Sequence, residues 1–428
     1  MIAKYYSRQS PANCAEIVAL NSVSATNERR YHRYFHAPLT SAVRSILFSI
    51  ALIVLIAFPC LAQSNLVKSY EDRGVSSFRK GDFDAAIADF DAVIAFEPES
   101  AAAHYNRGNA LFRKGDLDGA VRDYDDAIAI DAGFAPAYCS RAAVDYFRGN
   151  LDQATADGEH ALAINPKLSK AYLILGAVWE KKGEFDKAIA SYDRCIKLAP
   201  KLAEAYSFRG AAYKKKGDVR RAIGEYNRAL EIQPNLVSAL NNRALARLAL
   251  KDARGATEDL NAAINKAPAS APLYFNRGAM RLESADFAGA ISDLSEAIAR
   301  DPGYADAYVD RGRAKEATGD WPGAIDDFDK AIGAAPGNAL AYNNRGSAEQ
   351  HIGNLKAAID DFSKAIESDP DCALAFGNRA LIYFLEGHDN DGRQDMLRCY
   401  SLDPKLREAF EPKVRAILAK RTYVNASR

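Results

Sequence analysis

Two sets of oppositely charged residues recur along this chain at a constant spacing and could form ion pairs. Nine arginines lie at multiples of 34 residues from one another, and an aspartate or glutamate follows each of them sixteen residues later. A guanidinium can donate two hydrogen bonds to one carboxylate while its aliphatic stem packs. The spacing therefore predicts ion pairs with a structural role, which include Arg107 with Asp123, Arg277 with Asp293, and Arg345 with Asp361.

At one point of the 34-residue spacing, both the arginine and the acid are missing. Leu175 stands where the arginine is expected, and Ser191 stands where the acid is expected. Because both charges are lost together, we expect each arginine to pair with the acid sixteen residues ahead. As an alternative, the arginines could hold the anionic groups of a ligand, but the nine matched acids argue against this reading.

Signatures of enzymes and of metal sites are missing from the sequence. It contains no H-E-x-x-H, no G-x-x-x-x-G-K, no G-x-S-x-G and no pairing of cysteines with the spacing of a zinc site. The histidines between residues 100 and 400 fall in separate segments. We therefore expect a protein that is not an enzyme and that has no cofactor.

The spacing of the charges follows from a 34-residue repeat. Small residues mark it, with glycine at seven points of the lattice and Ala142, Ala244 and Ala380 at the others. If each of these small residues is numbered as the eighth position, ten repeats follow one another without insertion. The repeats are 67–100, 101–134, 135–168, 169–202, 203–236, 237–270, 271–304, 305–338, 339–372 and 373–406.

Each repeat has the pattern of two packed helices. The fourth position is aromatic in eight repeats, the twentieth is alanine in nine, and the twenty-fourth is mostly large. Small residues at positions 8 and 20 allow two helix backbones to approach, and large residues fill the space around that contact. Glycine at position 15, as in Gly115, ends the first helix, and proline at position 32, as in Pro200, ends the second.

This pattern of aromatic, small, alanine, large and proline positions resembles that of the tetratricopeptide repeat family, over residues 67–406. The resemblance implies an all-α fold, a right-handed α-solenoid in which the first helix of each repeat lines a concave groove. Because one repeat cannot bury its apolar face alone, the repeats must stack. Residues 407–428 are expected to hold a capping helix that begins near Pro412 and covers the last repeat with Ala416, Ile417 and Leu418.

The resemblance also implies that a peptide or protein segment binds in the groove, through positions 2, 5, 6, 9, 12 and 13. Asparagines at position 6 could bond a peptide backbone as donor and acceptor, although they could equally solvate the helix faces. Aromatic residues such as Phe147, Phe275 and Phe384 could anchor a partner or belong to the core between repeats. The groove residues we select are Asn106, Asn109, Phe112, Tyr146, Lys181, Lys214, Asn242, Asn276, Asn344 and Asn378.

The first 62 residues differ from the repeats. Arg44 precedes the apolar run Ile46–Phe58, and "PCLAQS" follows it. A basic residue, a short apolar run and small residues are typical of a secretory signal peptide, which predicts cleavage after Ala62 and a periplasmic or secreted protein. As an alternative, the run stays uncleaved and anchors the repeats outside the inner membrane. The 43 residues before Arg44 are too many for the segment that precedes the apolar run in an ordinary signal peptide. We therefore expect translation to start near Val43.

The charge balance argues against nucleic acid as a partner. The whole chain has 56 basic and 56 acidic residues, and residues 1–62 hold six basic and two acidic ones. The remaining residues therefore carry a net charge of −4. A mildly acidic body favours a protein or peptide partner over a polyanion.

Overall fold

The computed structural model describes residues 63–426, and the apolar run Ile46–Phe58 lies outside this range. Among the described residues, none of the helices combines the length and the apolar character that crossing a membrane requires. The chain divides into two compact parts, residues 1–99 and 100–428. Of the first part, the structure describes a helix over residues 63–80 and α2 (Phe83–Phe96).

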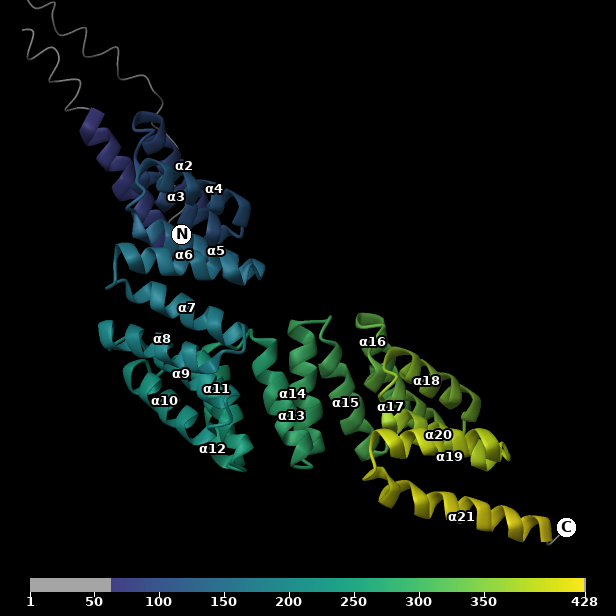
Figure 1. Ribbon diagram of the computed structural model, residues 1–428. Coiled ribbons are helices and arrows are strands. Elements are labelled where there is room, and N and C mark those ends of the chain that lie inside the picture. Colours follow the sequence, from purple (N-terminus) through teal and green to yellow (C-terminus); the bar gives the residue numbers. More distant parts are fainter. Residues whose placement is uncertain (1–62, 427–428) are drawn as a thin grey trace, which may run out of the picture. The chain divides into compact units, whose positions relative to one another are not determined.

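The second part consists of helix pairs, one pair for each repeat from the second to the tenth (Figure 1). The first helices are α3 (Ala101–Lys114), α5 (Ala135–Arg148), α7 (Ser169–Lys181), α9 (Ala203–Lys215), α11 (Val237–Ala249), α13 (Ala271–Glu283), α15 (Ala305–Thr318), α17 (Ala339–His351) and α19 (Ala373–Glu386). The second helices are α4 (Leu117–Ile130), α6 (Leu151–Ile164), α8 (Phe185–Leu198), α10 (Val219–Ile232), α12 (Ala253–Lys266), α14 (Phe287–Arg300), α16 (Trp321–Ala334), α18 (Leu355–Ser368) and α20 (Asp389–Leu402).

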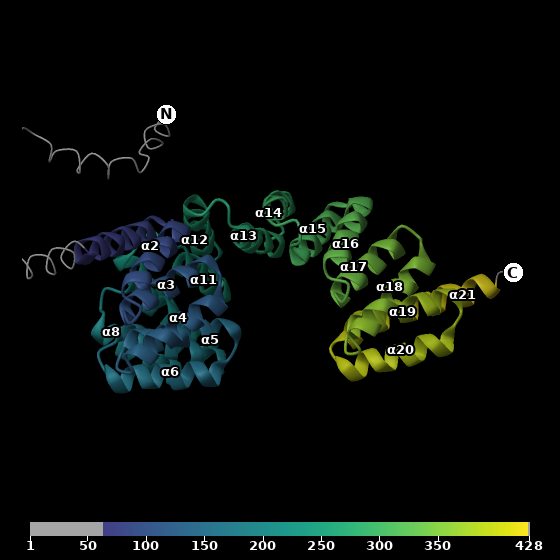
Figure 2. The same ribbon diagram turned by 90° about the horizontal axis from the view of Figure 1, so that it is seen from above.

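These pairs stack in chain order, as Figure 2 also shows for α13 to α20. Each second helix contacts the first helix of its own repeat and that of the next repeat. First helices of neighbouring repeats also contact one another, whereas within residues 100–426 no second helix contacts another second helix. The first helices therefore form the inner layer, and the fold is the all-α solenoid that the repeat pattern predicts.

A close contact inside each repeat explains the small residue at position 8. In the second repeat, a Cβ atom added to Gly108 would lie 2.8 Å from the ring of Tyr124, which is fully buried. The same ring packs with Ala120 and Ala127 of its own helix and with Ala137 of the next repeat. Because protein cores have few voids, a larger residue at Gly108 would displace the ring.

The turn between the two helices of a repeat requires a left-handed residue. Gly115 has φ 94°, and its amide closes the end of α3 on the carbonyls of Leu111 and Phe112. In two repeats this turn residue is not glycine. Lys251 and Ala285 stand there, and they have the left-handed φ values of 63° and 61°. Residues with a Cβ atom adopt this region at a cost, so these two turns are strained.

The capping helix differs from the prediction in its start and in the residues that it buries. α21 (Leu406–Ala426) begins before Pro412, which lies inside the helix. Phe410 is buried and packs with Leu406, Val414 and Ile417 against the last repeat, whereas Ala416 and Leu418 are exposed. The reason is that Phe410 stands 34 residues after Phe376 and continues the aromatic position, while Gly377 leaves room for its ring.

Candidate binding groove

The inner wall is marked by contacts between the first helices of neighbouring repeats. Asn276 Nδ2 of α13 donates to Asn241 Oδ1 of α11 at 2.8 Å. Lys215 Nζ of α9 lies 3.0 Å from Glu180 Oε1 of α7. The residues at positions 5, 6, 12 and 13 thus lie along the seam of the inner layer, where the groove residues were expected.

The asparagines on this wall fall into two groups. Asn106 and Asn242 are half-buried, and within residues 63–421 no hydrogen bond of their side chains is found. Asn276 and Asn378 instead donate to asparagines of the preceding repeat, Asn241 and Asn343. These two amides join neighbouring repeats, so the row is not uniformly open to a partner.

Two further asparagines are also engaged. Asn344 Oδ1 accepts from Asn343 Nδ2 at 3.2 Å, while the buried Nδ2 of Asn344 has no partner in the described part of the chain. Asn109 Oδ1 accepts a hydrogen bond from the hydroxyl of Tyr124 at 2.9 Å. Asn109 therefore supports the core residue of its own repeat.

Aromatic side chains cluster on α3 and α5. The ring centroids of Phe112 and Phe147 are 5.5 Å apart, and those of Tyr146 and Phe147 are 5.6 Å apart. The side chain of Phe147 is 64% exposed, so most of its apolar surface faces solvent. On α9, Phe208 is 41% exposed at position 6. Phe208 stands where several other repeats have asparagine.

Of the two readings that the sequence left open for Phe384, a groove anchor or a core residue, the core reading is confirmed. Phe384 is 3% exposed and packs with Met396 and Phe410 beneath the capping helix. Gly392 stands where other repeats have alanine, and a Cβ atom there would lie 3.0 Å from the ring of Phe384. The missing methyl group gives the ring its place in the core.

The lysines of the wall differ in their surroundings. Lys181 Nζ donates to the carbonyl of Tyr146 at 3.3 Å and lies 5.1 Å from the centre of its ring. Lys214 is half-buried, and burial lowers the pKa of its ammonium. Among the described residues, no side-chain hydrogen bond or ion pair involves Lys214. Within the described part of the chain, Lys214 is thus a cation without an acidic partner.

Repeats seven and eight carry an acidic stretch of the wall that the sequence analysis missed. Asp310 is paired with Arg313, at 2.8 Å, yet burial raises the pKa of Asp310, and the charges of Asp306 and Glu283 add to the effect. Burial raises the pKa of Glu316 to about 7, although Arg313 opposes the shift. Four acidic residues occupy groove positions in these two repeats, and this pattern in the sequence would have predicted the acidic stretch.

The arginines at position 7 lie away from this wall and bind acids within their repeats. Arg107 donates from Nε and Nη2 to the two oxygens of Asp123, at 2.9 and 2.6 Å. Arg277 and Asp293 have the same geometry at 2.8 and 2.6 Å, and Arg345 and Asp361 at 2.9 and 2.5 Å. The carboxylates are buried, so each arginine compensates the buried charge of an acid in its own repeat.

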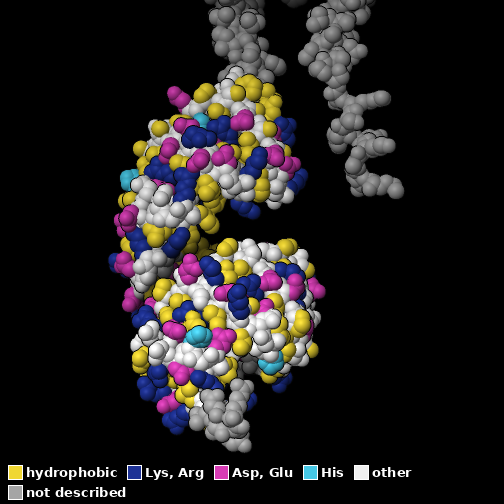
Figure 3. Space-filling model, turned by 90° about the vertical axis from the view of Figure 1, so that its right-hand side faces the viewer, with side chains coloured by type: hydrophobic (Ala, Val, Ile, Leu, Met, Phe, Trp, Pro, Cys, Tyr) yellow, Lys and Arg dark blue, Asp and Glu magenta, His cyan; other side chains and the backbone are white. Residues whose placement is uncertain are grey.

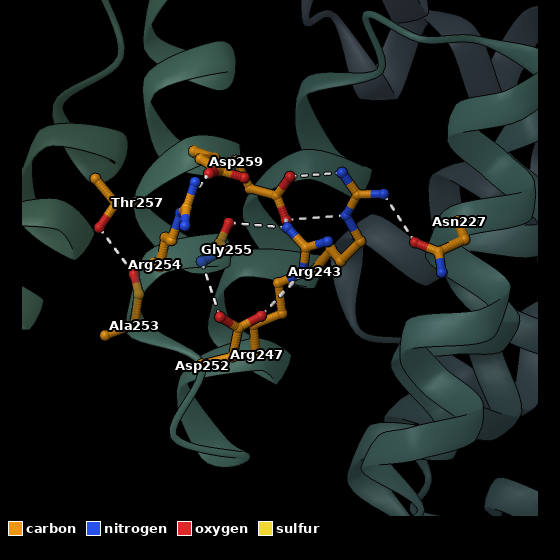
Figure 4. A network of polar contacts seen from close by, with 10 residues as sticks. Asn227, Arg243, Arg247, Asp252, Ala253, Arg254, Gly255, Thr257 and Asp259 are labelled. Atoms are coloured by element: carbon orange, nitrogen blue, oxygen red, sulfur yellow. Dashed lines mark hydrogen bonds and ion pairs between the residues drawn. The ribbon is translucent and has the colours of Figure 1, made fainter.

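The same arginines also reach the preceding repeat, which the sequence analysis did not foresee. The third nitrogen of Arg277, Nη1, donates to Asn261 Oδ1 at 2.6 Å, and that of Arg379 donates to Ser363 Oγ at 2.9 Å. In repeats six to eight a second cation joins the pair. Figure 4 shows it in repeat six, where Arg247 and Arg243 share Asp259 while Arg243 also holds Asn227.

Repeat four has an apolar contact in place of the pair. Leu175 is buried, and its side chain lies beside Gly158 of repeat three, where a Cβ atom would lie 2.8 Å from it. Gly158 occupies position 24, which is large in most repeats. Ser191 donates to the carbonyl of Lys187 within its own helix, at 2.9 Å. Leu175 therefore fills the space that the small residue of the preceding repeat leaves.

One group of side chains in the described residues has the composition of a metal site. Donor atoms of His104, Asp123 and Asp126 all lie within 4.8 Å of one another. Asp123, however, already accepts two hydrogen bonds from Arg107. A divalent ion would have to compete with this guanidinium, so we assign no metal there.

Basic and acidic side chains are mixed on the face of the molecule drawn in Figure 3, without one large basic area. Neither sign of charge dominates this face.

Similar proteins were found among known families and solved structures, whereas no curated protein matches the chain. The crystal structure of MamA protein is 28% identical, with a TM-score of 0.34, over 40% of this chain and 94% of that one. YrrB, described as a TPR protein with an unusual peptide-binding site, is 24% identical, with a TM-score of 0.33, over 42% and 92%. A tetratricopeptide repeat protein from Parabacteroides merdae ATCC 43184 is 18% identical, with a TM-score of 0.47, over 58% and 99%.

Family models match in five stretches of the chain. Models described as "Tetratricopeptide repeat" match residues 72–136 and 277–339, 339–372, and 203–236, and one described as "TPR repeat" matches residues 180–217. Two of the matched stretches, 203–236 and 339–372, coincide with repeats five and nine. The chain belongs to the tetratricopeptide repeat family, whose fold is that of a scaffold for interactions between proteins.

Proposed function

We propose that this protein is a non-enzymatic scaffold that binds an extended segment of another protein along its inner wall. The observation that carries the proposal is the exposure of large apolar side chains, Phe147 and Phe208, on that wall. Solvent-exposed aromatic residues are enriched where proteins bind one another. Asn106 and Asn242 add amide groups for which the described residues supply no hydrogen-bond partner.

The test is a binding measurement with the full chain and fluorescent peptides that have no structure of their own. We expect the double variant Asn106→Ala, Asn242→Ala to bind about tenfold more weakly, because each lost hydrogen bond contributes about 0.5–1.5 kcal/mol. Asn235→Ala, in an exposed loop outside the wall, is the matched control. Equal binding by the wild type and the double variant would remove the amides from the site.

The aromatic side chains are tested separately. Phe147→Ala and Phe208→Ala should each weaken binding, since truncation of a buried anchor at an interface commonly costs more than 1 kcal/mol. Ile164→Ala changes an exposed apolar residue at the end of a second helix and serves as the control. If no unstructured peptide binds the wild type, the proposed function is wrong.

We also propose that the protein is exported across the inner membrane. The support is Arg44, the apolar run Ile46–Phe58 and the small residues after it. Export and cleavage after Ala62 predict a periplasmic or secreted protein whose N-terminus is Gln63. Fractionation with N-terminal sequencing tests this, because an uncleaved anchor would keep the protein in the membrane fraction.

A further inference from the structure

The charge of the inner wall changes sign along the chain. At the groove positions, repeats four and five have four lysines and two glutamates, and repeats seven and eight have four acids and one arginine. The first set is Lys170, Lys181, Lys214, Lys215, Glu180 and Glu204, and the second is Glu283, Asp306, Asp310, Glu316 and Arg313. Repeat six, between them, has only uncharged residues at these positions.

The basic section is combined with apolar surface. Glu180 is already bound, because it accepts from the hydroxyl of Tyr192 at 3.1 Å and pairs with Lys215. Lys214 is left half-buried and without a partner among the described residues. Phe208 and Phe147 are exposed on the same layer. This section therefore suits a segment that combines carboxylates with apolar side chains.

The acidic section has too few cations for its carboxylates. Arg313 is the one basic residue at these positions of repeats seven and eight, and its partner is Asp310. Glu316 is half-buried, and among the described residues no side-chain hydrogen bond or ion pair involves it. Lysine or arginine side chains of a partner would supply the missing positive charge.

We infer that the inner wall fixes the orientation of its partner, a protein segment whose acidic and apolar end lies on repeats three to five and whose basic end lies on repeats seven and eight. The inference rests on the proposed function and adds the charge pattern of the partner. Opposite charges across an interface set the register of binding, and like charges that face each other weaken it. The segment must therefore reach from repeat three to repeat eight, a span of six repeats.

The experiment is photo-cross-linking of the full chain with two synthetic peptides of about sixteen residues, long enough at about 3.4 Å per residue to span these repeats. One half alternates Glu and Leu, and the other alternates Lys and Ser. In the second peptide the two halves are exchanged. Each peptide is made with a benzophenone at its acidic end or at its basic end, and the cross-linked residues are found by mass spectrometry.

We expect the acidic end to cross-link within residues 135–215 and the basic end within residues 271–318, for both peptides, because the peptide backbone turns round to follow the charges. Lys214→Gln and Glu316→Gln should each weaken binding about threefold to tenfold, whereas Lys197→Gln, exposed outside the wall, should not. Cross-links spread evenly over both sections, or exchanged between them, would overturn the inference while leaving the proposed function intact. If neither peptide binds, both fail.

Discussion

Repeats four and eight fill the same space in opposite ways. In repeat eight, Asp327 is fully buried and accepts from Arg311 at 2.6 and 2.9 Å and from Lys315 at 2.8 Å. In repeat four, Leu175 takes the place of the arginine and packs beside Gly158 of repeat three. The buried ion pair of repeat eight and the leucine contact of repeat four are thus two ways of completing the core of the solenoid.

The comparison shows that the unit of coupling is larger than one repeat. A leucine at position 7 is accompanied by the loss of the acid in its own repeat and of the large residue at position 24 in the repeat before. The arginine, in contrast, reaches back to a polar residue of the preceding repeat, as Arg311 does to Ser295 Oγ at 3.0 Å. In repeats three to ten, the position 7 residue therefore joins two repeats.

The largest effect is expected when the carboxylate of repeat eight is removed. Asp327→Ala leaves Arg311 and Lys315 half-buried without their acid, and we expect a loss of about 3–5 kcal/mol in the free energy of unfolding. Urea denaturation followed by circular dichroism measures it. The matched control is Asp326→Ala, an exposed partner of Lys330, which should cost at most about 1 kcal/mol. Equal midpoints for the two variants would contradict the role given to the buried pair.

The apolar solution of repeat four can be broken in the same way. Leu175→Ala leaves a cavity beside Gly158 and should cost about 2–5 kcal/mol. Gly158→Ala should cost about 1–3 kcal/mol, because its methyl group would overlap Leu175. The two substitutions together should cost less than their sum, since the methyl group partly fills the cavity. Additive losses would show that the two residues do not share one space.

Most of the fold could be predicted from the sequence because the same pattern of small, large and helix-ending residues recurs along ten repeats. The pairing of Arg107 with Asp123 could also be predicted, since the two charges recur and disappear together. The relation between Leu175 and Gly158 was missed because it crosses a repeat boundary and occurs once. The start of α21 was predicted too late, at Pro412, because Phe410 continues the aromatic position and its core packing with Leu406 lies before that proline.

The groove was harder to predict because its residues vary from repeat to repeat. Asn242 and Asn276 have the same position in their repeats, yet Asn276 is bound by Asn241, whereas no side-chain hydrogen bond of Asn242 is found within residues 63–421. The difference comes from the neighbouring repeat, which has asparagine at position 5 in one case and not in the other. The residue at one groove position therefore does not predict whether its side chain is free to bind a partner, because this depends on the facing residue of the neighbouring repeat.

A pH effect separates the inner wall of repeat eight from that of repeat four. The pKa of Glu316 is about 7 in the folded chain, against 4.5 for the ordinary group. Between these values the folded state binds more protons than the unfolded state, so stability should fall as the pH rises from about 4.5 through 7. Because Glu316 is only half-buried, we expect a change of about 1–2 kcal/mol.

The Glu316→Gln variant isolates this effect. Its stability should be independent of this titration, so the difference between wild type and variant should change across the window in denaturation curves at pH 5 and pH 8. Gln350→Glu, at the same position of repeat nine, tests whether the neighbouring wall shifts a carboxyl in the same way. A constant difference between wild type and Glu316→Gln at the two pH values would show that Glu316 titrates in its ordinary range.

The smallest effects concern the turns, where repeats six and seven differ from four and eight. Gly183 and Gly319 adopt left-handed φ values as glycine does readily, while Lys251 and Ala285 adopt them with a Cβ atom. Ala285→Gly should therefore stabilise the protein by up to about 1 kcal/mol, and Gly319→Ala should destabilise it by about 1 kcal/mol.

The strained turn of repeat seven is bridged by Arg281, which binds Asp293 at 2.8 Å and the carbonyl of Gly289 at 3.2 Å. If this bridge offsets the strain, Arg281→Ala should cost less in the Ala285→Gly background than in the wild type, and equal costs in both would show that the bridge and the turn are independent.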